Sequence, residues 1–276
     1  MKDFRGKVAA ITGAGSGIGR GLALELASRG CHLALVDINE TSVLETATDA
    51  RARGVKVTSG VLDVAKREDV YSWADEVVRE HGSVNLVFNN AGVAVGATVE
   101  GIEYADFEWL MNINFWGVVY GTKAFLPHLK ASADGHIVNI SSVFGIIAAP
   151  TQAAYNASKF AVRGFTESLR LELELQKCGV SATSIHPGGI KTNIAKAARM
   201  NDSISSVGAD PSNAREKLSA GFITTPHKAA LQILRAVEKD ARRGLIGPDA
   251  VFIDLAQRVL PASYQNLVKS AIKRMM

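Results

Sequence analysis

The chain has 276 residues, and 47% of them are hydrophobic, enough to form the core of one large α/β domain. Its net charge is +4, but Lys and Arg alternate with Asp and Glu along most of its length. That pattern favours a solvated surface over a nucleic-acid partner. No apolar run is long enough to cross a bilayer, and residues 1–5 lack the apolar core of a signal peptide. Together with two widely spaced cysteines, this predicts a cytoplasmic protein with reduced thiols.

The first predicted element is a phosphate-binding unit in residues 7–19. A short apolar run leads directly into a turn that contains Gly13, Gly17 and Gly19, and a helical pattern follows over residues 18–26. Glycines let the backbone N–H groups approach a pyrophosphate, and the start of a helix adds unpaired donors and partial positive charge. A dinucleotide is therefore the expected ligand, although glycines also close ordinary turns.

A second apolar run, residues 32–36, ends at Asp37, about twenty residues beyond the glycine turn, as expected for a ribose-binding acid. A carboxylate there accepts hydrogen bonds from both ribose hydroxyls of an adenosine and repels the extra phosphate of NADP. Ser16 supports NAD as well, because a basic side chain in the turn would be expected for holding that phosphate. The alternative is that Asp37 only caps a helix that begins near Thr41.

Strands and helices are expected to alternate through the rest of the first half. Strands are predicted at 56–62 and 84–88, with helices from about 41 to 53 and from 67 to 81. The crossover rule then gives a Rossmann-type doubly wound parallel sheet of about seven strands, with helices on both faces. Asp63 and the pair Asn89 and Asn90 follow strand ends, at the edge where ligands bind.

The second half places polar residues in a similar way. Asn114 lies in an apolar stretch of a predicted helix, residues 103–130, and so needs a buried partner or a function. A strand at 135–140 ends next to Ser142. Tyr155 and Lys159 are four residues apart on a helix that starts after Pro150, so they share one helical face.

The spacing of Tyr155 and Lys159 has a chemical consequence. A free tyrosine has a pKa of about 10 and is a poor base at neutral pH. An ammonium held nearby favours the phenolate, so we expect a lowered pKa for Tyr155 and a usable acid/base. Such a spacing is also common on ordinary helix surfaces and carries weight only together with the other motifs.

Taken together, these motifs resemble the short-chain dehydrogenase/reductase family. The match covers roughly residues 5–192 and includes TGAGSGIG at 12–19, NNAG at 89–92, Asn114, Ser142, the Tyr155/Lys159 pair and Pro187-Gly188. The resemblance implies a catalytic tetrad of Asn114, Ser142, Tyr155 and Lys159. It also implies that the nicotinamide cofactor is bound by Gly13, Ser16, Gly17, Ile18, Gly19, Asp37, Asp63, Val64, Asn90, Ala91, Tyr155, Lys159, Pro187, Ile190 and Thr192.

In that family the tyrosine exchanges a proton with the substrate hydroxyl and the serine orients the substrate oxygen. The lysine binds the nicotinamide ribose and lowers the tyrosine pKa, and the asparagine holds a water. The six histidines show no metal-binding spacing, so no catalytic metal is expected, and His186 at a strand end is expected to be structural.

The substrate side is expected to be apolar. Val93, Val95, Phe144, Ile146 and Ile147 indicate a pocket for a hydrophobic alcohol or ketone, although several of them can equally pack a lid. In the family the region of about residues 193–222 is a mobile lid. A helix over 226–242 and a strand near 245–247 complete a domain of residues 1–250.

Residues 251–276 form a predicted C-terminal extension of two amphipathic helices separated by Pro261. Its apolar positions are Val251, Leu255, Val259, Tyr264, Leu267, Val268, Ala271, Ile272 and Met275, with Lys269, Lys273 and Arg274 largely opposite. A basic amphipathic end can bind an anionic membrane surface, but more often it covers the domain's own pocket or a neighbouring subunit. We expect truncation after Gly247 to change oligomeric state or substrate affinity without abolishing NAD binding.

The sequence therefore predicts an NAD(H)-dependent oxidoreductase, a homodimer or homotetramer, acting on a secondary alcohol or its ketone. Three alternatives remain at this point. One is an NADP-dependent carbonyl reductase, and another is a nucleotide-sugar epimerase or dehydratase of the related extended group, for which the chain is short. The third is a dinucleotide-binding sensor or scaffold without catalysis, against which the intact tetrad argues.

Overall fold

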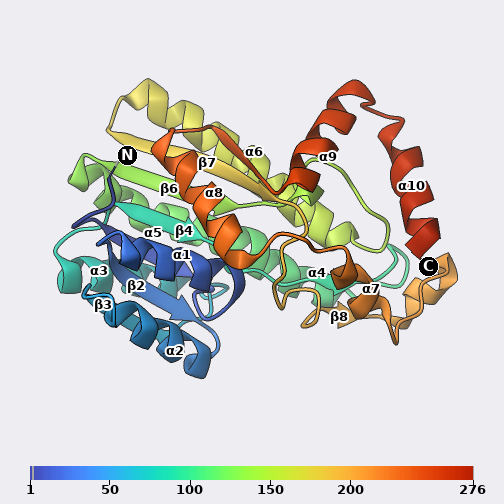
Figure 1. Cartoon of the computed structure of the whole chain (residues 1–276), viewed down its shortest axis with the longest axis horizontal. Helices are drawn as coiled ribbons and strands as arrows, with labels where there is room; N and C mark the ends of the chain where they lie inside the picture. Colours follow the sequence, from blue (N-terminus) through green and yellow to red (C-terminus); the bar gives the residue numbers. More distant parts are fainter. Residues whose placement is uncertain (2, 276) are drawn as a thin grey trace.

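The computed structural model describes residue 1 and residues 3–275, with the side chains of 218 and 271–275 excepted. A seven-stranded parallel sheet runs through it in the order β3-β2-β1-β4-β6-β7-β9, with helices on both faces (Figure 1). The predicted Rossmann-type fold is confirmed. The sheet strands are β1 (Val8–Thr12), β2 (His32–Asp37), β3 (Val57–Val61), β4 (Leu86–Asn89), β6 (Gly135–Ile140), β7 (Val180–Pro187) and β9 (Arg243–Ile246).

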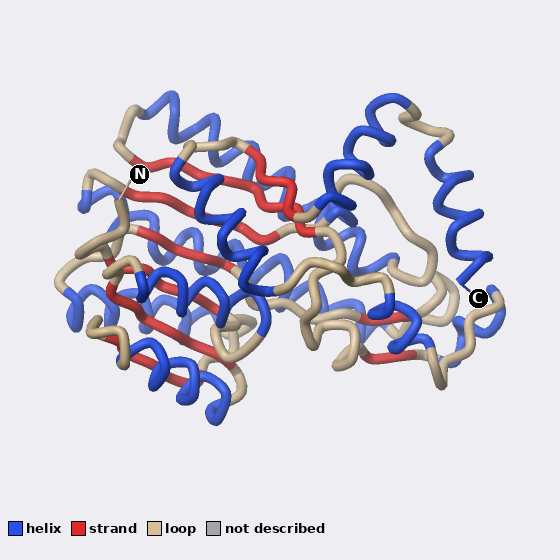
Figure 2. Tube along the Cα trace, viewed as in Figure 1, coloured by secondary structure: helices blue, strands red, loops and turns tan. Residues whose placement is uncertain are grey.

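A second, two-stranded sheet is separate from the central one, and in it β5 (Val95–Gly96) pairs with β8 (Arg199–Met200). Figure 2 shows where the strands, helices and loops lie along the trace. The helices are α1 (Gly17–Ser28), α2 (Glu40–Arg51), α3 (Arg67–His81), α4 (Tyr104–Met111), α5 (Gly117–Ser132), α6 (Ala153–Gln176), α7 (Ala214–Ala220), α8 (Pro226–Glu238), α9 (Pro248–Val259) and α10 (Tyr264–Met275). Short 3₁₀ turns are η2 (Val143–Gly145) and η3 (Asp202–Val207).

The central strand β1 shows how the sequence builds the layers. All five of its residues are buried, as a strand covered on both faces requires. Because successive side chains point to opposite faces, Ala9 and Ile11 join the core under α1, α2 and α8. Val8 and Ala10 join the other core, under α3, α5 and α6. The parallel strands consequently end at one common edge.

The predicted helix over residues 103–130 is interrupted. A π-helical turn, η1 (Asn112–Trp116), separates α4 from α5. π-turns of this kind are rare and insert one extra residue into a helix, which changes the direction of the side chains that follow. Residues 193–222, the expected lid, contain β8, η3 and α7.

The C-terminal extension consists of two helices, as predicted, although the first begins at Pro248. In Figure 1, α9 and α10 lie beyond the sheet, on the side of the lid segment and away from α1, α2 and α3. Tyr264 at the start of α10 packs against Ile146 and Ile147, and its hydroxyl accepts a hydrogen bond from the Ala148 N–H at 3.3 Å. The extension therefore covers the loop that follows β6. The side chains of Ala271, Ile272, Lys273, Arg274 and Met275 lie outside the described residues.

Candidate active site

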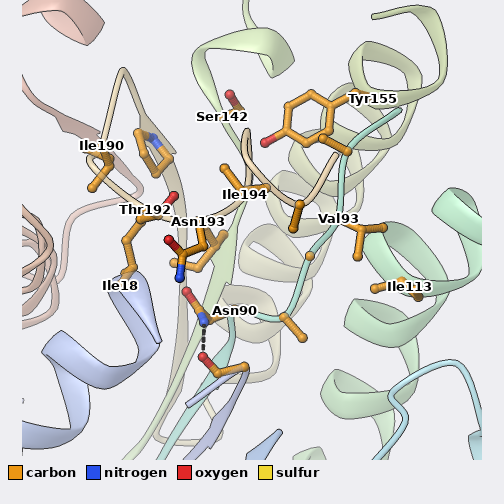
Figure 3. Close-up of a pocket in the computed structure, with 18 of the residues that line it drawn as sticks. Ile18, Asn90, Val93, Ile113, Ser142, Tyr155, Ile190, Thr192, Asn193 and Ile194 are labelled. Carbon is orange, nitrogen blue, oxygen red and sulfur yellow. Dashed lines mark hydrogen bonds between the residues drawn. The ribbon is translucent and has the colours of Figure 1, made fainter. Parts of the chain in front are cut away.

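A cavity of about 560 Å³ opens along the carboxyl edge of the sheet (Figure 3). It runs from the glycine turn after β1, past the ends of β2, β4 and β6, to α6 and the loop after β7. All the site residues predicted from the sequence line it, except Gly19 and Asn114. Because the strands are parallel, their carboxyl ends meet at one edge of the sheet, and most of the predicted site residues lie together there.

The glycine turn is built so that only glycine fits. Gly13 has φ +64° and Gly17 has φ +54°, a backbone region that favours glycine. A Cβ on Gly19 would lie 2.1 Å from the Gly13 carbonyl oxygen, so a side chain there would break the turn. Gly19 thus packs against the turn without lining the cavity, whereas Gly17 and Ile18 at the start of α1 line it. This is a cradle of the kind that binds phosphate.

Asp37 faces the same turn from the end of β2. Its carboxylate accepts hydrogen bonds from the Gly15 N–H at 2.8 Å and the Asn39 N–H at 3.0 Å. The alternative that Asp37 caps the next helix is wrong, because the N-cap is Asn39, whose side chain accepts from the Ser42 N–H. Asp37 is therefore oriented on the edge of the cleft, next to the glycine turn.

Asn90 ties the end of β4 to the glycine turn. Its amide nitrogen donates to the carbonyl oxygens of Thr12 at 2.9 Å and Gly13 at 3.1 Å. Figure 3 marks one bond from Asn90 with a dashed line. In return, the Thr12 hydroxyl accepts from the N–H groups of Asn90 and Ala91. Asn90 therefore fixes this edge of the sheet through contacts with the backbone. Asn89 instead bonds Thr122 and Asn139 within the core.

Ser142, Tyr155 and Lys159 meet at the end of the cavity that is lined by α6 and the end of β6. The Tyr155 hydroxyl points into the space between Ser142 and Ile194 (Figure 3). Lys159 Nζ lies 5.4 Å from the centre of the Tyr155 ring and donates to the Ile140 carbonyl oxygen at 3.0 Å. The Ser142 hydroxyl accepts from the Phe144 N–H at 3.1 Å. The helix spacing and the end of β6 place three polar groups around one point.

The pKa values of this cluster differ from the sequence-based expectation. Burial raises the pKa of Tyr155 to about 12, and the nearby Ser142 only partly opposes it. The predicted lowering of the tyrosine pKa is therefore wrong for this structure, because desolvation of the phenolate dominates. Burial also lowers the pKa of Lys159 to about 8. At neutral pH the pair is a protonated phenol beside an ammonium.

Asn114 holds the backbone of the strand-end loop. Its side chain accepts from the Val93 N–H at 2.8 Å and donates to the Val93 carbonyl oxygen at 2.9 Å. A third contact reaches the Ser158 hydroxyl at 3.3 Å. The fully buried amide thus finds its partners in the loop after β4.

His186 is structural, as predicted from its strand-end position. Burial lowers its pKa to about 4, so the ring is neutral. Because a carbonyl oxygen can only accept, Nδ1 donates to the Ser142 carbonyl oxygen at 3.0 Å, and Nε2 bonds the Ser184 hydroxyl. His186 therefore fixes the chain at Ser142.

The substrate side is apolar, but not through all the predicted residues. Val93 and Phe144 line the cavity. The prediction for Val95, Ile146 and Ile147 is wrong: Val95 packs in the core around α4, and the two isoleucines pack under Tyr264. The expected lid segment contributes Asn193, Ile194, Ala197 and Phe222, and three side chains that the sequence did not reveal complete the wall: Trp109, Ile113 and Gln152.

These missed residues belong to no motif, and only the three-residue spacing of Gln152 from Tyr155 was a usable signal. Gln152 is just 7% exposed.

Among the described residues, no group of three His, Cys, Asp or Glu side chains is arranged to hold a metal ion. Over the same part of the chain, none of the helices combines the length and apolarity that a membrane crossing requires.

Comparison with known proteins gives the same assignment. The family profile described as short chain dehydrogenase matches residues 7–203. SadH of Mycobacterium tuberculosis, which is named as an oxidoreductase, is 47% identical over 275 residues, covering 99% of this chain and 98% of its own. Human estradiol 17-beta-dehydrogenase 11 is 32% identical over 98% of this chain and 85% of its own.

The fold agrees with a solved structure as well. A short-chain dehydrogenase/reductase from Burkholderia phymatum, crystallised in complex with NAD, superposes with a TM-score of 0.86 at 30% identity, covering 94% of this chain and 95% of its own. Sequence profile, relatives and fold therefore agree with the geometry of the cleft. The chain belongs to the short-chain dehydrogenase/reductase family of oxidoreductases.

Proposed function

We propose that the protein transfers a hydride between NAD(H) and a hydrophobic secondary alcohol or its ketone, with Tyr155 as the general acid/base. The observation that carries this proposal is the meeting of Tyr155, Ser142 and Lys159 at one end of the cleft, with the phosphate cradle at the other. A group placed between them would contact both a proton donor and a bound dinucleotide.

The residues along the cleft fit a nicotinamide dinucleotide. The glycine turn would hold the pyrophosphate, with Ser16, Gly17 and Ile18 at the start of α1. Asp37 would bind the ribose of the adenosine, with Asp63 and Val64 near its adenine and Asn90 and Ala91 along the floor. Lys159 would bind the nicotinamide ribose, and Pro187, Ile190 and Thr192 would hold the carboxamide end.

When bound, the dinucleotide supplies or accepts the hydride. In the reduction direction Tyr155 donates its proton to the substrate oxygen, and Ser142 orients that oxygen by a hydrogen bond. The raised pKa of Tyr155 keeps the phenol protonated and ready for this step at neutral pH. The Lys159 ammonium stabilises negative charge that develops on the phenol oxygen. Asn114 holds the Val93 backbone and so preserves the wall opposite.

The substrate class follows from the cavity wall. Val93, Trp109, Ile113, Phe144 and Phe222 present apolar surface, which favours a hydrophobic substrate. The human relative is named for estradiol, a hydrophobic secondary alcohol, which supports the same class. Residues 193–222 would act as a lid over this half of the cavity.

A Tyr155→Phe variant tests the mechanism. It removes only the hydroxyl, so we expect kcat to fall by about a hundredfold or more while the NADH dissociation constant stays the same. The assay follows nicotinamide absorbance with a panel of ketones and alcohols. Full activity in this variant would refute the assigned acid/base. A wild-type protein that binds NADH but converts no member of the panel would favour the sensor or scaffold alternative.

The choice of NAD over NADP rests on Asp37, whose carboxylate is fixed by Gly15 and Asn39. The ratio of kcat/KM for the two cofactors measures it, and a preference for NADP would favour the carbonyl reductase alternative. We further propose a catalytic domain of residues 1–250 with the extension 251–276, a homodimer or homotetramer, and a cytoplasmic location. Cys31 and Cys178 are free thiols, which suits that location.

A further inference from the structure

The loop after β7 is bonded to the first turn of α9. Asp249, the second residue of α9, accepts a hydrogen bond from the Gly189 N–H through Oδ2 at 2.6 Å. Gly189 itself lines the cavity, sixty residues away in the sequence. A hydrogen bond to an ionised carboxylate is among the stronger ones in proteins. An acid outside the catalytic motifs thus contacts the cleft wall.

The Asp249 carboxylate packs closely against two glycines, which have no side chain in its way. A Cβ on Gly188 would lie 2.1 Å from Asp249 Oδ2 and 2.5 Å from Oδ1, and a Cβ on Gly247 would lie 2.5 Å from Oδ1. Gly247 also has φ +97°, which turns the chain so that Asp249 faces back towards the loop. A side chain at Gly188 would displace the acid.

The neighbouring backbone groups of this loop bond elsewhere, and the Gly189 N–H bonds Asp249. Gly188 N–H donates to the Ile246 carbonyl oxygen at 2.9 Å. The Gly189 carbonyl oxygen accepts from the N–H groups of Ile223 and Thr224, both at 3.2 Å. The loop is therefore fixed to β9, to the end of the lid segment and to α9, directly before it reaches Ile190.

We propose that Asp249 is a positioning residue for the nicotinamide end of the cofactor. By fixing Gly189 it sets the position of Ile190 and Thr192, to which the proposed function assigns the carboxamide, and the inference rests on that assignment. Asp249 acts through the loop backbone and touches no reacting atom. The start of α9 then belongs to the cofactor site, so truncation after Gly247, which removes Asp249, is expected to weaken NAD binding as well.

The test compares two ligands on purified variants, by titration of protein fluorescence. NADH reaches both ends of the cleft, whereas ADP-ribose lacks the nicotinamide ring. In Asp249→Ala we expect the NADH dissociation constant to rise by about tenfold, as for a lost hydrogen bond to a charged group. ADP-ribose affinity should change less than about twofold, because the contacts to its pyrophosphate and adenosine are untouched.

Two further variants complete the design. Asp249→Asn keeps an oxygen acceptor for the Gly189 N–H and should restore most of the NADH affinity. Asp254→Asn is the matched control on the same helix: Asp254 binds Arg243 and Arg258, so its loss should lower thermal stability without altering NADH affinity. If Asp249→Ala does not fold, Gly188→Ala should produce the same selective loss by displacing the carboxylate.

NADH affinity unchanged in Asp249→Ala would overturn the proposal, and so would an equal loss of NADH and ADP-ribose. A wild-type protein that binds neither ligand would instead refute the proposed function. The two failures are therefore distinguishable without any measurement of turnover.

Discussion

Lys159 is a buried cation whose proton is expected to limit the pH range of catalysis. Burial lowers its pKa from 10.5 to about 8, so the ammonium is lost as the pH rises through 8. Tyr155, with a pKa raised to about 12, keeps its proton over the same range. We expect kcat/KM for ketone reduction to fall above a pH of about 8. A pH profile measured from about 6 to 10 at constant ionic strength checks this.

Lys159→Arg is the control, because its guanidinium stays charged throughout the range. Its overall rate should be lower, but the inflection near pH 8 should disappear. A wild-type profile that stays flat to pH 10 would contradict the assignment. Stability gives a second readout: between pH 8 and 10.5 the unfolded chain binds the proton that the folded chain lacks, so this group makes the free energy of unfolding rise with pH.

Residues at strand ends were predictable from the sequence, and residues that reach the cleft from a distance were not. Asp37 and Ser142 follow apolar runs, and the parallel-sheet rule places them at the ligand-binding edge. Asp249 follows a strand too, but its contact with Gly189 depends on a turn at Gly247 that no motif reveals. The tyrosine pKa was mispredicted because burial, which outweighs charge at this site, is a tertiary property.

Among the elements, β8 contacts α4 through a cation–π interaction and an ion pair. The Arg199 guanidinium lies 3.5 Å from the centre of the Trp109 ring, and its Nη1 pairs with Asp106 at 2.6 Å. Trp109 lines the cavity, so this contact joins the lid segment to the substrate wall. We expect Arg199→Ala to raise the substrate KM by about threefold to fivefold, since such exposed contacts contribute about 0.5–1 kcal/mol. Steady-state kinetics at saturating NADH measure the change.

Arg199→Lys separates the two contacts, because lysine keeps the charge but loses the planar stacking. An intermediate KM is expected if stacking carries most of the effect. If the KM of the alanine variant equals that of the wild type, the contact does not hold the lid. An altered NADH dissociation constant would also count against the idea, since the stacked pair lies on the substrate side.

The interruption of the predicted helix 103–130 has a physical cause that the sequence shows only in part. Asn114 was recognisable as a polar residue in an apolar stretch that required a partner. Its partner is the backbone of Val93, and the π-turn η1 sets the direction of the side chain towards it. Hydrophobic periodicity cannot distinguish one extra residue within a turn from a regular helix.

At the scale of the whole molecule, α6 carries an apolar stripe on its outer face. Phe160, Leu171 and Leu175 lie at helical spacing, and the two leucines are 53% and 83% exposed. Gly164 on the same face has open space around it. We expect this stripe to form the subunit contact of a homodimer, because exposed apolar patches commonly mark interfaces. Leu175→Glu should shift the mass measured by light scattering towards the monomer.

Leu255→Glu provides the matched control, since Leu255 is 58% exposed on the outer face of α9. It should leave the mass unchanged. Dissociation by the α9 variant and not by the α6 variant would place the contact on the extension instead.

The fold was the most predictable property of the molecule. Alternating apolar runs and amphipathic stretches, together with the right-handed crossover rule, predict a parallel sheet with helices on both faces, and the structure has that sheet. The placement of α9 and α10 was not predictable, because amphipathic spacing shows that a helix has an apolar face and not which surface that face covers.

The order in which the chain is synthesised gives the extension one more consequence. Within this sequence β1 precedes the other strands and lies in the middle of the sheet, whereas Asp249 and Tyr264 follow the last strand of the sheet. A nascent chain can therefore assemble its nucleotide-binding half early, during translation at about 5–20 residues per second. The bonds from Gly189 to Asp249 and from Ala148 to Tyr264 can form only after α9 and α10 have been synthesised, so these two contacts with the cleft loops are expected to form after the central sheet.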